Sequence, residues 1–443
     1  HLDRMAREGL KLTQFYVSNT ACTPSRSALM TGTYAHRIGM DGRVVFPGEK
    51  RGLNPKEITI AELLKKQGYA TGCFGKWHLG DEDAYQPYNR GFSEVFIHGA
   101  GGIGQSYPGS CADFPPNRVK ETRYFDIAAL HNETIVKTEG FCTDVFFQAA
   151  LGFIRQQHQA KTPFFAYIST NAPHGPMIAP ASYKKRFADL GWEEKTQGRY
   201  GMIENIDDNV GLLMKKLDEW KLWENTLVIF MTDNGQAGGG ARKNGKPQRI
   251  FSAGFKSGKG SPFEGGTHVP AFWRWKGVLG EGVDVPALTA HIDLYQTFCQ
   301  LAGVTIPDDI QKIDGRSLVA LLENPGADWA DRELFTHVGR WEKGADPNLS
   351  KFKSCAVRSQ RWRLVNNQLL YDITADPYEK TNVAADHPDV VQRLRQAYDA
   401  WWTETVPLMV NEDAPYAARQ PQEVRYEKQL KDRGIPRWSP PKL

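Results

Sequence analysis

The stretch "RYGMIENIDDNVGLLMKKLDEWKLWENTLVIFMTDNG", residues 199–235, indicates the fold class. Its first part, residues 199–220, has apolar residues at helical spacing and predicts a long amphipathic helix. The run "TLVIFM", residues 226–231, predicts a short buried strand that opens directly into Asp233 and Asn234. A helix followed by a buried strand with polar residues at its end is typical of α/β crossover units.

The same alternation occurs twice upstream. Residues 58–68 predict a helix ended by a glycine, and residues 69–74 predict a buried strand that leads into "GKWHLG". Residues 141–157 predict a helix, and the strand "PFFAYIST" follows and leads into "NAPHGP". Ligand sites of such sheets lie beyond the carboxyl ends of the strands. We therefore expect a large, mostly parallel sheet flanked by helices, with Lys76, His78, His174, Asp233 and Asn234 gathered at one edge.

The pattern of the chain changes near residue 332. Four short strand-like runs, from "ELFTHV" to "LLYDI", precede the helical pattern "PDVVQRLRQAYDAWWTE". They predict a small antiparallel sheet with one helix over residues 332–410, packed on a catalytic domain of residues 1–331. Residues 411–443 are charged and rich in proline, which predicts a tail that wraps the surface or is poorly ordered.

Composition excludes several classes of protein. The chain has 443 residues, 40% of them hydrophobic and 24% charged, and its net charge of +4 is too small to indicate a nucleic-acid partner. No apolar run approaches the roughly 20 residues of a membrane span. The first residues, "HLDRMAREGLKL", already follow a helical pattern, so we expect the natural start to lie further upstream. The lack of a signal peptide then says nothing about export.

A candidate nucleophile lies in "CTPSRSALMTG", residues 22–32. Thr23 is a typical N-cap, Pro24 a typical first helical residue and Gly32 a typical helix end. Cys22 would then lie at the positive end of a helix dipole, where anions bind, with Arg26 one turn further on. The alternative is a small buried cysteine before an ordinary capped helix.

The residues after the predicted strands each allow two interpretations. Asp233 and Asn234 suit a hard cation such as calcium, although Asp-Asn-Gly is also turn chemistry. Lys76 and His78 share one face of an extended segment, or they are a solvated lysine beside a packed histidine. His174 lies between prolines that stiffen its loop, and it either serves a preorganised site or caps the backbone.

A basic run covers residues 241–266, "ARKNGKPQRIFSAGFKSGKGSPFEGG". Six cations precede its first acid, Glu264: Arg242, Lys243, Lys246, Arg249, Lys256 and Lys259. Glycine allows a backbone to approach an anion closely, which favours an anion-facing role, with Lys259 best placed. The alternative is a solvated surface loop.

Taken together, these segments resemble the formylglycine-dependent sulfatase family, which has an alkaline-phosphatase-like fold. The resemblance runs from residue 1 to about residue 405 and rests on motifs in a fixed order. They are "CTPSRSALMTG", "GYATGCFGKWHLG", "APHGP", "TDNG", "GKGSPFEGGTHVP", "HIDLYQTFCQLAG" and "LYDITADPYEKTNVA". The first contains the C-x-P-S-R signal that the formylglycine-generating enzyme reads, and it is highly specific.

The resemblance implies a role for each candidate. Cys22 would be oxidised to formylglycine, whose hydrate supplies the nucleophile and a second hydroxyl that expels sulfate. Arg26 and Lys76 would stabilise the ionised diol, and His78 would accept the proton that drives elimination. His174 and Lys259 would contact the sulfate and the leaving oxygen, one of them supplying a proton. Calcium, held by Asp233, Asn234 and residue 22, would polarise the sulfate.

The sequence departs from the family pattern in two places. The family's other two acidic metal ligands lie on a first strand, N-terminal to the region that matches "HLDRMAREG". We therefore expect this chain to lack a central strand and to have an incomplete metal site. His268 stands where relatives often carry arginine, and we assign it to substrate binding together with Arg242 and Lys243.

The resemblance implies a sulfuric ester hydrolase that is periplasmic or secreted, and we expect its substrate to be a sulfated carbohydrate, more specifically a polysaccharide. Residues 98–124, with Tyr107, Phe114, Arg123 and Tyr124, and the basic run would line the leaving-group side. The alternatives are a phosphodiesterase or phosphonate hydrolase of the same superfamily, and a non-catalytic protein that binds sulfated glycans. The sequence leaves open whether Cys111 and Cys142 pair, and it does not indicate the oligomeric state.

Overall fold

The computed structural model describes residues 1–41, 43–103, 123–342, 344–410 and 414–443. Cys111, Tyr107 and Phe114 lie outside the described residues, so the expectations for them are not addressed below. Within the described residues, none of the helices combines the length and the apolar character that crossing a membrane requires.

The first of two main sheets carries the segments around Lys76 and His174. Its strand order is β6 (Thr134–Lys137), β5 (Ala128–His131), β4 (Glu94–His98), β3 (Ala70–Lys76) and β7 (Phe164–Ser169). Strand β3 is parallel to β4 and β7, whereas β4, β5 and β6 pair antiparallel. The β5–β6 pairing follows from the two-residue connection 132–133, which leaves no room for a crossover.

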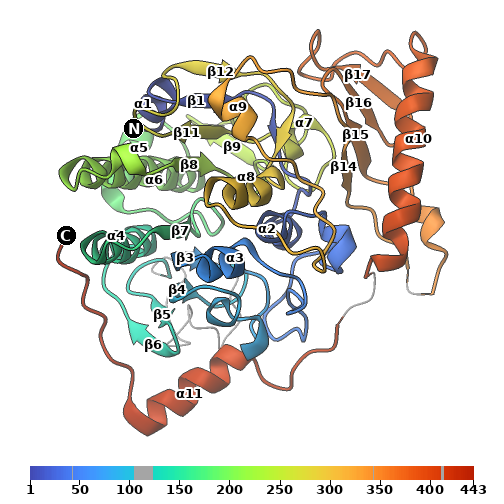
Figure 1. Cartoon of the computed structure of the whole chain (residues 1–443). Coiled ribbons are helices and arrows are strands. Elements are labelled where there is room, and N and C mark those ends of the chain that lie inside the picture. The colour runs from blue at the N-terminus through green and yellow to red at the C-terminus, as the bar shows by residue number, and fades with distance from the viewer. Residues whose placement is uncertain (42, 104–122, 343, 411–413) are drawn as a thin grey trace.

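The second main sheet carries the segment before Asp233. Its strand order is β12 (Val283–Val285), β1 (Leu10–Leu12), β11 (Ala271–Arg274) and β8 (Val228–Met231). Strand β1 is parallel to β12, and β11 is antiparallel to both β1 and β8. Strands β7 and β8 are the end strands of their sheets, and in Figure 1 they mark the edges at which the two sheets face each other. The main sheets are therefore mixed in direction, while the predicted α/β class is confirmed.

Helices cover both faces of the β3 sheet. Helix α4 (Cys142–Ala160) contacts β3, β7 and α6 (Glu194–Glu219), and α3 (Ile60–Lys66) contacts β3 and α8 (Asp293–Leu301) from the other side. Successive strand residues point to opposite faces, so Phe74 packs in the core below α4 and Cys73 packs in the core below α3. The amphipathic pattern of residues 199–220 is thus confirmed within α6, and the run 226–231 contains β8.

The remaining elements are short or peripheral. Helices α1 (Leu2–Arg7), α5 (Ala181–Asp189) and α9 (Val319–Glu323) flank the main sheets, α2 (Cys22–Thr31) lies beside α8, and α7 (Glu264–Thr267) is a single turn. Strands β2 (Phe15–Tyr16) and β13 (Thr289–Ala290) form a parallel pair, and β9 (Gly240–Lys243) and β10 (Lys246–Arg249) form a hairpin. Short 3-10 turns cover Ala35–Ile38, Asp83–Tyr85, Pro87–Asn89, Trp223–Asn225, Pro347–Ser350 and Val406–Leu408.

The predicted C-terminal antiparallel sheet is confirmed. Its strand order is β14 (Leu334–His337), β15 (Cys355–Arg358), β16 (Trp362–Val365) and β17 (Leu369–Asp372), with every neighbouring pair antiparallel. Helix α10 (Pro388–Thr405) buries Tyr398 and Trp402 against this sheet, in a core that also contains Tyr16 and Ala28 of the main body. The small sheet and the main body therefore share a continuous apolar contact.

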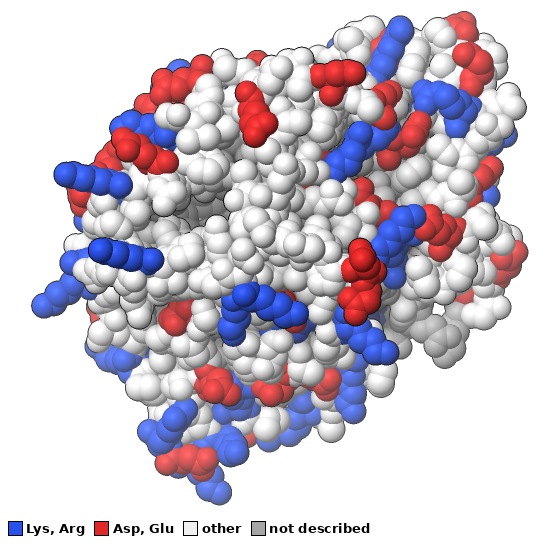
Figure 2. Space-filling model, viewed as in Figure 1, with Lys and Arg blue, Asp and Glu red and all other residues white. Residues whose placement is uncertain are grey.

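The tail after α10 returns to the first main sheet and contains helix α11 (Pro421–Arg433). The Gln429 amide exchanges two hydrogen bonds of 2.7 Å with the backbone of Ile135 on β6. The Trp438 ring lies 4.8 Å from that of Phe96 on β4. On the face drawn in Figure 2, basic and acidic side chains are interspersed rather than gathered into a patch of one sign.

Candidate active site

Cys22 is the first residue of helix α2, and Ala21 is its N-cap. The backbone N–H of Ser25 donates to the Ala21 carbonyl at 3.0 Å, so the N-cap lies two residues before the predicted one, Thr23. The Thr23 hydroxyl is used elsewhere: it donates to the His78 carbonyl at 3.0 Å and accepts the Val45 N–H at 3.1 Å. Gly32 ends the helix in the left-handed region, φ 69°, as the sequence predicts.

Two cations of the predicted set, Lys259 and Arg26, connect the Cys22 helix to other segments. The Lys259 Nζ lies 3.0 Å from the Cys22 Sγ, which is 3% exposed as part of its residue. Arg26, one turn along α2, contacts the Asp233 Oδ2 at 3.0 Å through both Nε and Nη2. Its Nη1 donates to the Lys76 carbonyl at 2.8 Å. The helix start, the end of β3 and the end of β8 thus converge.

Lys76 is a buried cation without a paired anion. It is the last residue of β3 and is 2% exposed. Among the described residues, no hydrogen bond or ion pair reaches its ammonium group. Burial lowers the Lys76 pKa, although Cys22 and Asp233 act against this shift. An unpaired buried charge is costly, so this position favours an anionic ligand as the missing partner.

The cations stabilise negative charge on their neighbours. Burial raises the pKa of the Cys22 thiol, but Lys76, Lys259 and Arg26 together hold it below its ordinary value. Burial also raises the pKa of Asp233, and the same three cations reverse this and lower it to about 2. Residue 22 is therefore placed where an ionised side chain is stabilised.

The two predicted histidines are uncharged and each keeps one ring nitrogen available. The His78 Nε2 lies 2.9 Å from the Val45 carbonyl and must donate to it, which leaves a lone pair on the buried Nδ1. The His174 Nδ1 likewise donates to the Gly175 carbonyl at 2.8 Å. Burial and then Lys76 lower the pKa of both rings, that of His174 to about 4. Gly101 must be glycine, because a Cβ there would lie 2.3 Å from the His78 Nε2.

Asp233 and Asn234 fit part of a cation site. The Asn234 Oδ1 is buried and has no hydrogen-bond partner among the described residues, which is how a metal ligand looks without its ion. The Asp233 carboxylate is ionised and adjacent in sequence. Calcium takes six to eight oxygen ligands. No third carboxylate or imidazole of the described residues joins them in a metal-type cluster; a cluster of that kind, His1, Asp207 and Asp208, lies on the α1–α6 side.

Three predicted substrate residues lie away from these contacts. Arg242 and Lys243 are on the β9–β10 hairpin, where Lys243 Nζ lies 5.3 Å from the centre of the Trp192 ring. A substrate contact of His268 is not supported, because both of its ring nitrogens are occupied. Nδ1 lies 2.8 Å from the Glu264 carboxylate and Nε2 2.9 Å from the Thr13 carbonyl.

Sequence reasoning missed three residues that support the site. Tyr167 and Ser169 on β7 reach Arg26 and the Lys76 carbonyl, at 3.2 and 2.7 Å. His291 lies below α2, with its ring nitrogens 3.2 Å from the Ser18 Oγ and 3.5 Å from the Ser25 Oγ. The signal for the first two is the polar residue at every second position of "AYIS", just before the His174 loop.

The fold and the site define an α/β protein in which a cysteine at the start of a helix is surrounded by cations. Comparisons with known proteins show which family has these features. The sulfatase family model matches residues 1–304, and a model described as "N-sulphoglucosamine sulphohydrolase, C-terminal" matches residues 259–401. The chain belongs to the sulfatase family.

Individual relatives show the same similarity. The chain is 34% identical over 349 residues to N-acetylgalactosamine-6-sulfatase of Canis lupus familiaris, which covers 76% of this chain and 63% of that protein. It is 30% identical over 432 residues to arylsulfatase A of Homo sapiens, covering 89% and 81%. The crystal structure of Ps i-CgsB superposes with a TM-score of 0.77 at 28% identity, covering 98% and 92%. The chain thus spans slightly less than two thirds of the N-acetylgalactosamine-6-sulfatase.

Proposed function

We propose that the protein hydrolyses sulfate esters, with residue 22 as the nucleophile after the formylglycine-generating enzyme has oxidised Cys22. One observation carries the proposal: three cations, Arg26, Lys76 and Lys259, surround Cys22 with one carboxylate, Asp233, among them. The site therefore holds an excess of positive charge in a buried place. Fixed cations stabilise a transition state most strongly where water is excluded and where negative charge develops during the reaction.

The hydrogen bonds and ion pairs of each site residue indicate its role in the reaction. Arg26 is fixed by Asp233 and the Lys76 carbonyl, so it acts as a static positive charge beside residue 22. Lys76 is the unpaired cation and binds the sulfate group. His78, with a free Nδ1, can accept a proton, and His174 and Lys259 are the groups able to pass one to the leaving oxygen. Once formed, a formylglycine hydrate supplies one hydroxyl to take the sulfate and a second to release it.

A cation at Asp233 and Asn234 would add to this set. These two side chains, with residue 22, would hold it, and the open Asn234 Oδ1 supports the assignment. Calcium bound there supplies Lewis acidity toward the sulfate oxygens. We also propose a periplasmic or secreted location for the full protein, as the resemblance to the sulfatase family implies.

The proposal is tested by assaying the chain, co-expressed with a formylglycine-generating enzyme, on a matched panel. We expect turnover of sulfate monoesters to exceed that of phosphate monoesters, phosphate diesters and phosphonates carrying the same leaving group, because the sulfatase family model matches residues 1–304. Faster turnover of a diester or phosphonate would favour the hydrolase alternative. Binding of a sulfated glycan without turnover by formylglycine-containing protein would favour the non-catalytic one.

We further propose a sulfated carbohydrate as the substrate, bound in part by the basic hairpin. Ps i-CgsB was also solved in complex with k-i-k-neocarrahexaose, and its fold matches this chain with a TM-score of 0.76. In the hairpin, Lys246 pairs with Lys243 and Arg249 pairs with Gly240. The register therefore puts the two lysines on one face with the buried Ala241, and Arg242 and Arg249 on the other. No carboxylate of the described residues pairs with either arginine, and Phe251, 77% exposed, follows them.

We expect the double charge reversal Arg242→Glu and Arg249→Glu to lower kcat/KM on a sulfated oligosaccharide about 10-fold or more. A small aryl sulfate, which does not extend to the hairpin, should be turned over as by the wild type. The effect should shrink as salt rises, because exposed charges are screened. Steady-state kinetics on both substrates at two ionic strengths measures this.

The matched control is Lys243→Glu with Lys246→Glu, on the hairpin face that contacts Trp192. This pair carries the same charge change but should have the smaller effect on the oligosaccharide. Equal losses from both pairs would show that only the net charge of the hairpin matters. Equal losses on both substrates would contradict a substrate contact at the hairpin.

A further inference from the structure

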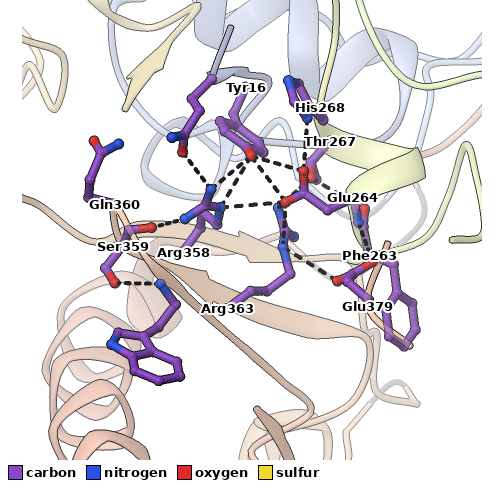
Figure 3. Close-up of polar contacts among 12 residues, drawn as sticks. Tyr16, Phe263, Glu264, Thr267, His268, Arg358, Ser359, Gln360, Arg363 and Glu379 are labelled. Atoms are coloured by element: carbon purple, nitrogen blue, oxygen red, sulfur yellow. Dashed lines mark hydrogen bonds and ion pairs between the residues drawn. The ribbon is translucent and has the colours of Figure 1, made fainter. Parts of the chain in front are cut away.

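A buried polar cluster connects the C-terminal sheet to the segment that carries Lys259 (Figure 3). Its centre is Glu264, the first residue of α7, which is 0% exposed. The Glu264 Oε1 accepts from the Arg363 Nη2 at 2.7 Å and from Nε at 3.0 Å. Its Oε2 accepts from the Tyr16 hydroxyl at 2.9 Å and lies 2.8 Å from the His268 Nδ1. The C-terminal sheet thus contributes the main cation of a site inside the main body.

Arg363 contacts more than the carboxylate. It is 1% exposed on β16, its Nη1 donates to the Pro262 carbonyl, and its Nη2 donates to the Thr267 Oγ1 at 3.0 Å. A single guanidinium therefore binds the backbone before α7, the carboxylate at its start and the hydroxyl at its end. Such a forked, planar group cannot be matched by another single side chain.

A second set of contacts holds the other end of the same segment. The Lys256 Nζ donates to the Tyr371 hydroxyl at 3.0 Å and to the Glu379 carbonyl at 3.2 Å. The Glu379 Oε2 accepts the backbone N–H of Glu264 at 2.9 Å. Residues from and after the C-terminal strands thereby fix both Lys256 and Glu264, and Lys259 lies between them.

The centre of the segment is attached to the active site through its backbone. The Lys259 N–H donates to the Gln236 carbonyl at 2.9 Å, and the Gly260 N–H donates to the Thr20 carbonyl at 3.2 Å. Gly258 allows this approach, since a Cβ there would lie 2.4 Å from the Gln236 carbonyl oxygen. The segment is short, so a shift of either anchored end moves the Lys259 ammonium relative to residue 22.

We propose that Arg363 is a positioning residue for the reaction: by binding Pro262, Glu264 and Thr267, it fixes residues 256–267 so that the Lys259 ammonium stays beside residue 22. The inference rests on the proposed function for its catalytic consequence. Its structural part, the dependence of residues 256–267 on Arg363, stands on the contacts alone. The C-terminal sheet is then a component of the active site, although none of its strands reaches Cys22.

Hydrogen–deuterium exchange of the full chain tests the structural part without any assay of activity. Arg363→Met should raise amide exchange in peptides from residues 256–268 by about 10-fold or more, while α10 and β14–β17 exchange as in the wild type. Arg363→Lys, which keeps the positive charge but lacks the forked guanidinium, should give an exchange rate between those of the wild type and Arg363→Met. The matched control is Arg361→Met, since Arg361 directly precedes β16 and pairs with Asp372 at the surface, where its side chain is 59% exposed. Unchanged exchange at 256–268, or faster exchange throughout the C-terminal sheet, would overturn the proposal.

A double-mutant cycle tests the catalytic part. Lys259→Met should lower kcat about 100-fold, as loss of one preorganised donor does, and Arg363→Met should cause a large part of the same loss. If Arg363 acts through Lys259, the double variant should be no slower than Lys259→Met alone. Losses that multiply would overturn the positioning role. A wild type without sulfatase activity would refute the proposed function, and the exchange experiment would still decide the dependence of the segment on Arg363.

Discussion

Cys22→Ala is expected to abolish sulfate ester turnover, by about 10⁴-fold or more, while the protein still folds and binds inorganic sulfate. The variant removes the only side chain at the start of α2 that can be converted into a nucleophile, and covalent catalysis has no substitute there. The cations remain, because Arg26 is held by Asp233 and Lys76 is buried in β3. Kinetics on a sulfate ester and calorimetric titration with sulfate separate the two effects.

The same prediction has a chemical readout. In wild-type chain made with a competent formylglycine-generating enzyme, mass spectrometry of the tryptic fragment that ends at Arg26 should show an aldehyde in place of the thiol. Cys73→Ala is the control, because Cys73 is buried in the core below α3, with burial holding its thiol protonated. Full sulfatase activity with Cys22 wholly unmodified would contradict the assignment.

The sequence predicts what local patterns determine. Helix α6 and strand β8 follow from a helical spacing and a short apolar run, and both signals lie within the elements themselves. The proximity of the ends of β3 and β8 agrees with the expectation that polar residues at the carboxyl ends of strands lie close together, although the two strands belong to separate sheets. Arg26 contacts both ends from α2, and that rule does not place it.

The sequence does not reveal contacts that distant segments decide. Helix α2 begins at Cys22, and Thr23 is not its N-cap. The Thr23 hydroxyl is instead hydrogen-bonded to the backbone of residues 45 and 78, which are far from it in the sequence. His268 faces Glu264 and Thr13 for the same reason. The hairpin has a local sequence signal, Asn244-Gly245, with positive φ at both residues. The strands around it are charged, however, and lack the alternating apolar residues that usually accompany this turn.

The second large effect is expected from Lys76→Met. This variant should keep or raise the Tm while it lowers turnover and sulfate binding. Methionine keeps the unbranched apolar stem of lysine and removes a buried ammonium group that lacks a partner among the described residues. The Tm without ligand should stay equal or rise by about 2 °C, because the cost of burying an unpaired charge disappears. Asp233 keeps its ion pair with Arg26 at 3.0 Å, so no new unpaired charge arises.

Function should fall in the same variant. Turnover of a sulfate ester should drop about 10³-fold and binding of inorganic sulfate should become undetectable, because a fixed cation in a buried site contributes most to an anion. Thermal unfolding with and without sulfate measures both: the wild type should be stabilised by the anion and Lys76→Met should not. Lys246→Met, on the exposed strand β10, is the control. It should change neither the Tm nor the stabilisation of the protein by sulfate. A variant that unfolds several degrees lower yet still binds sulfate would show that the Lys76 ammonium has a structural partner and that the anion is held elsewhere.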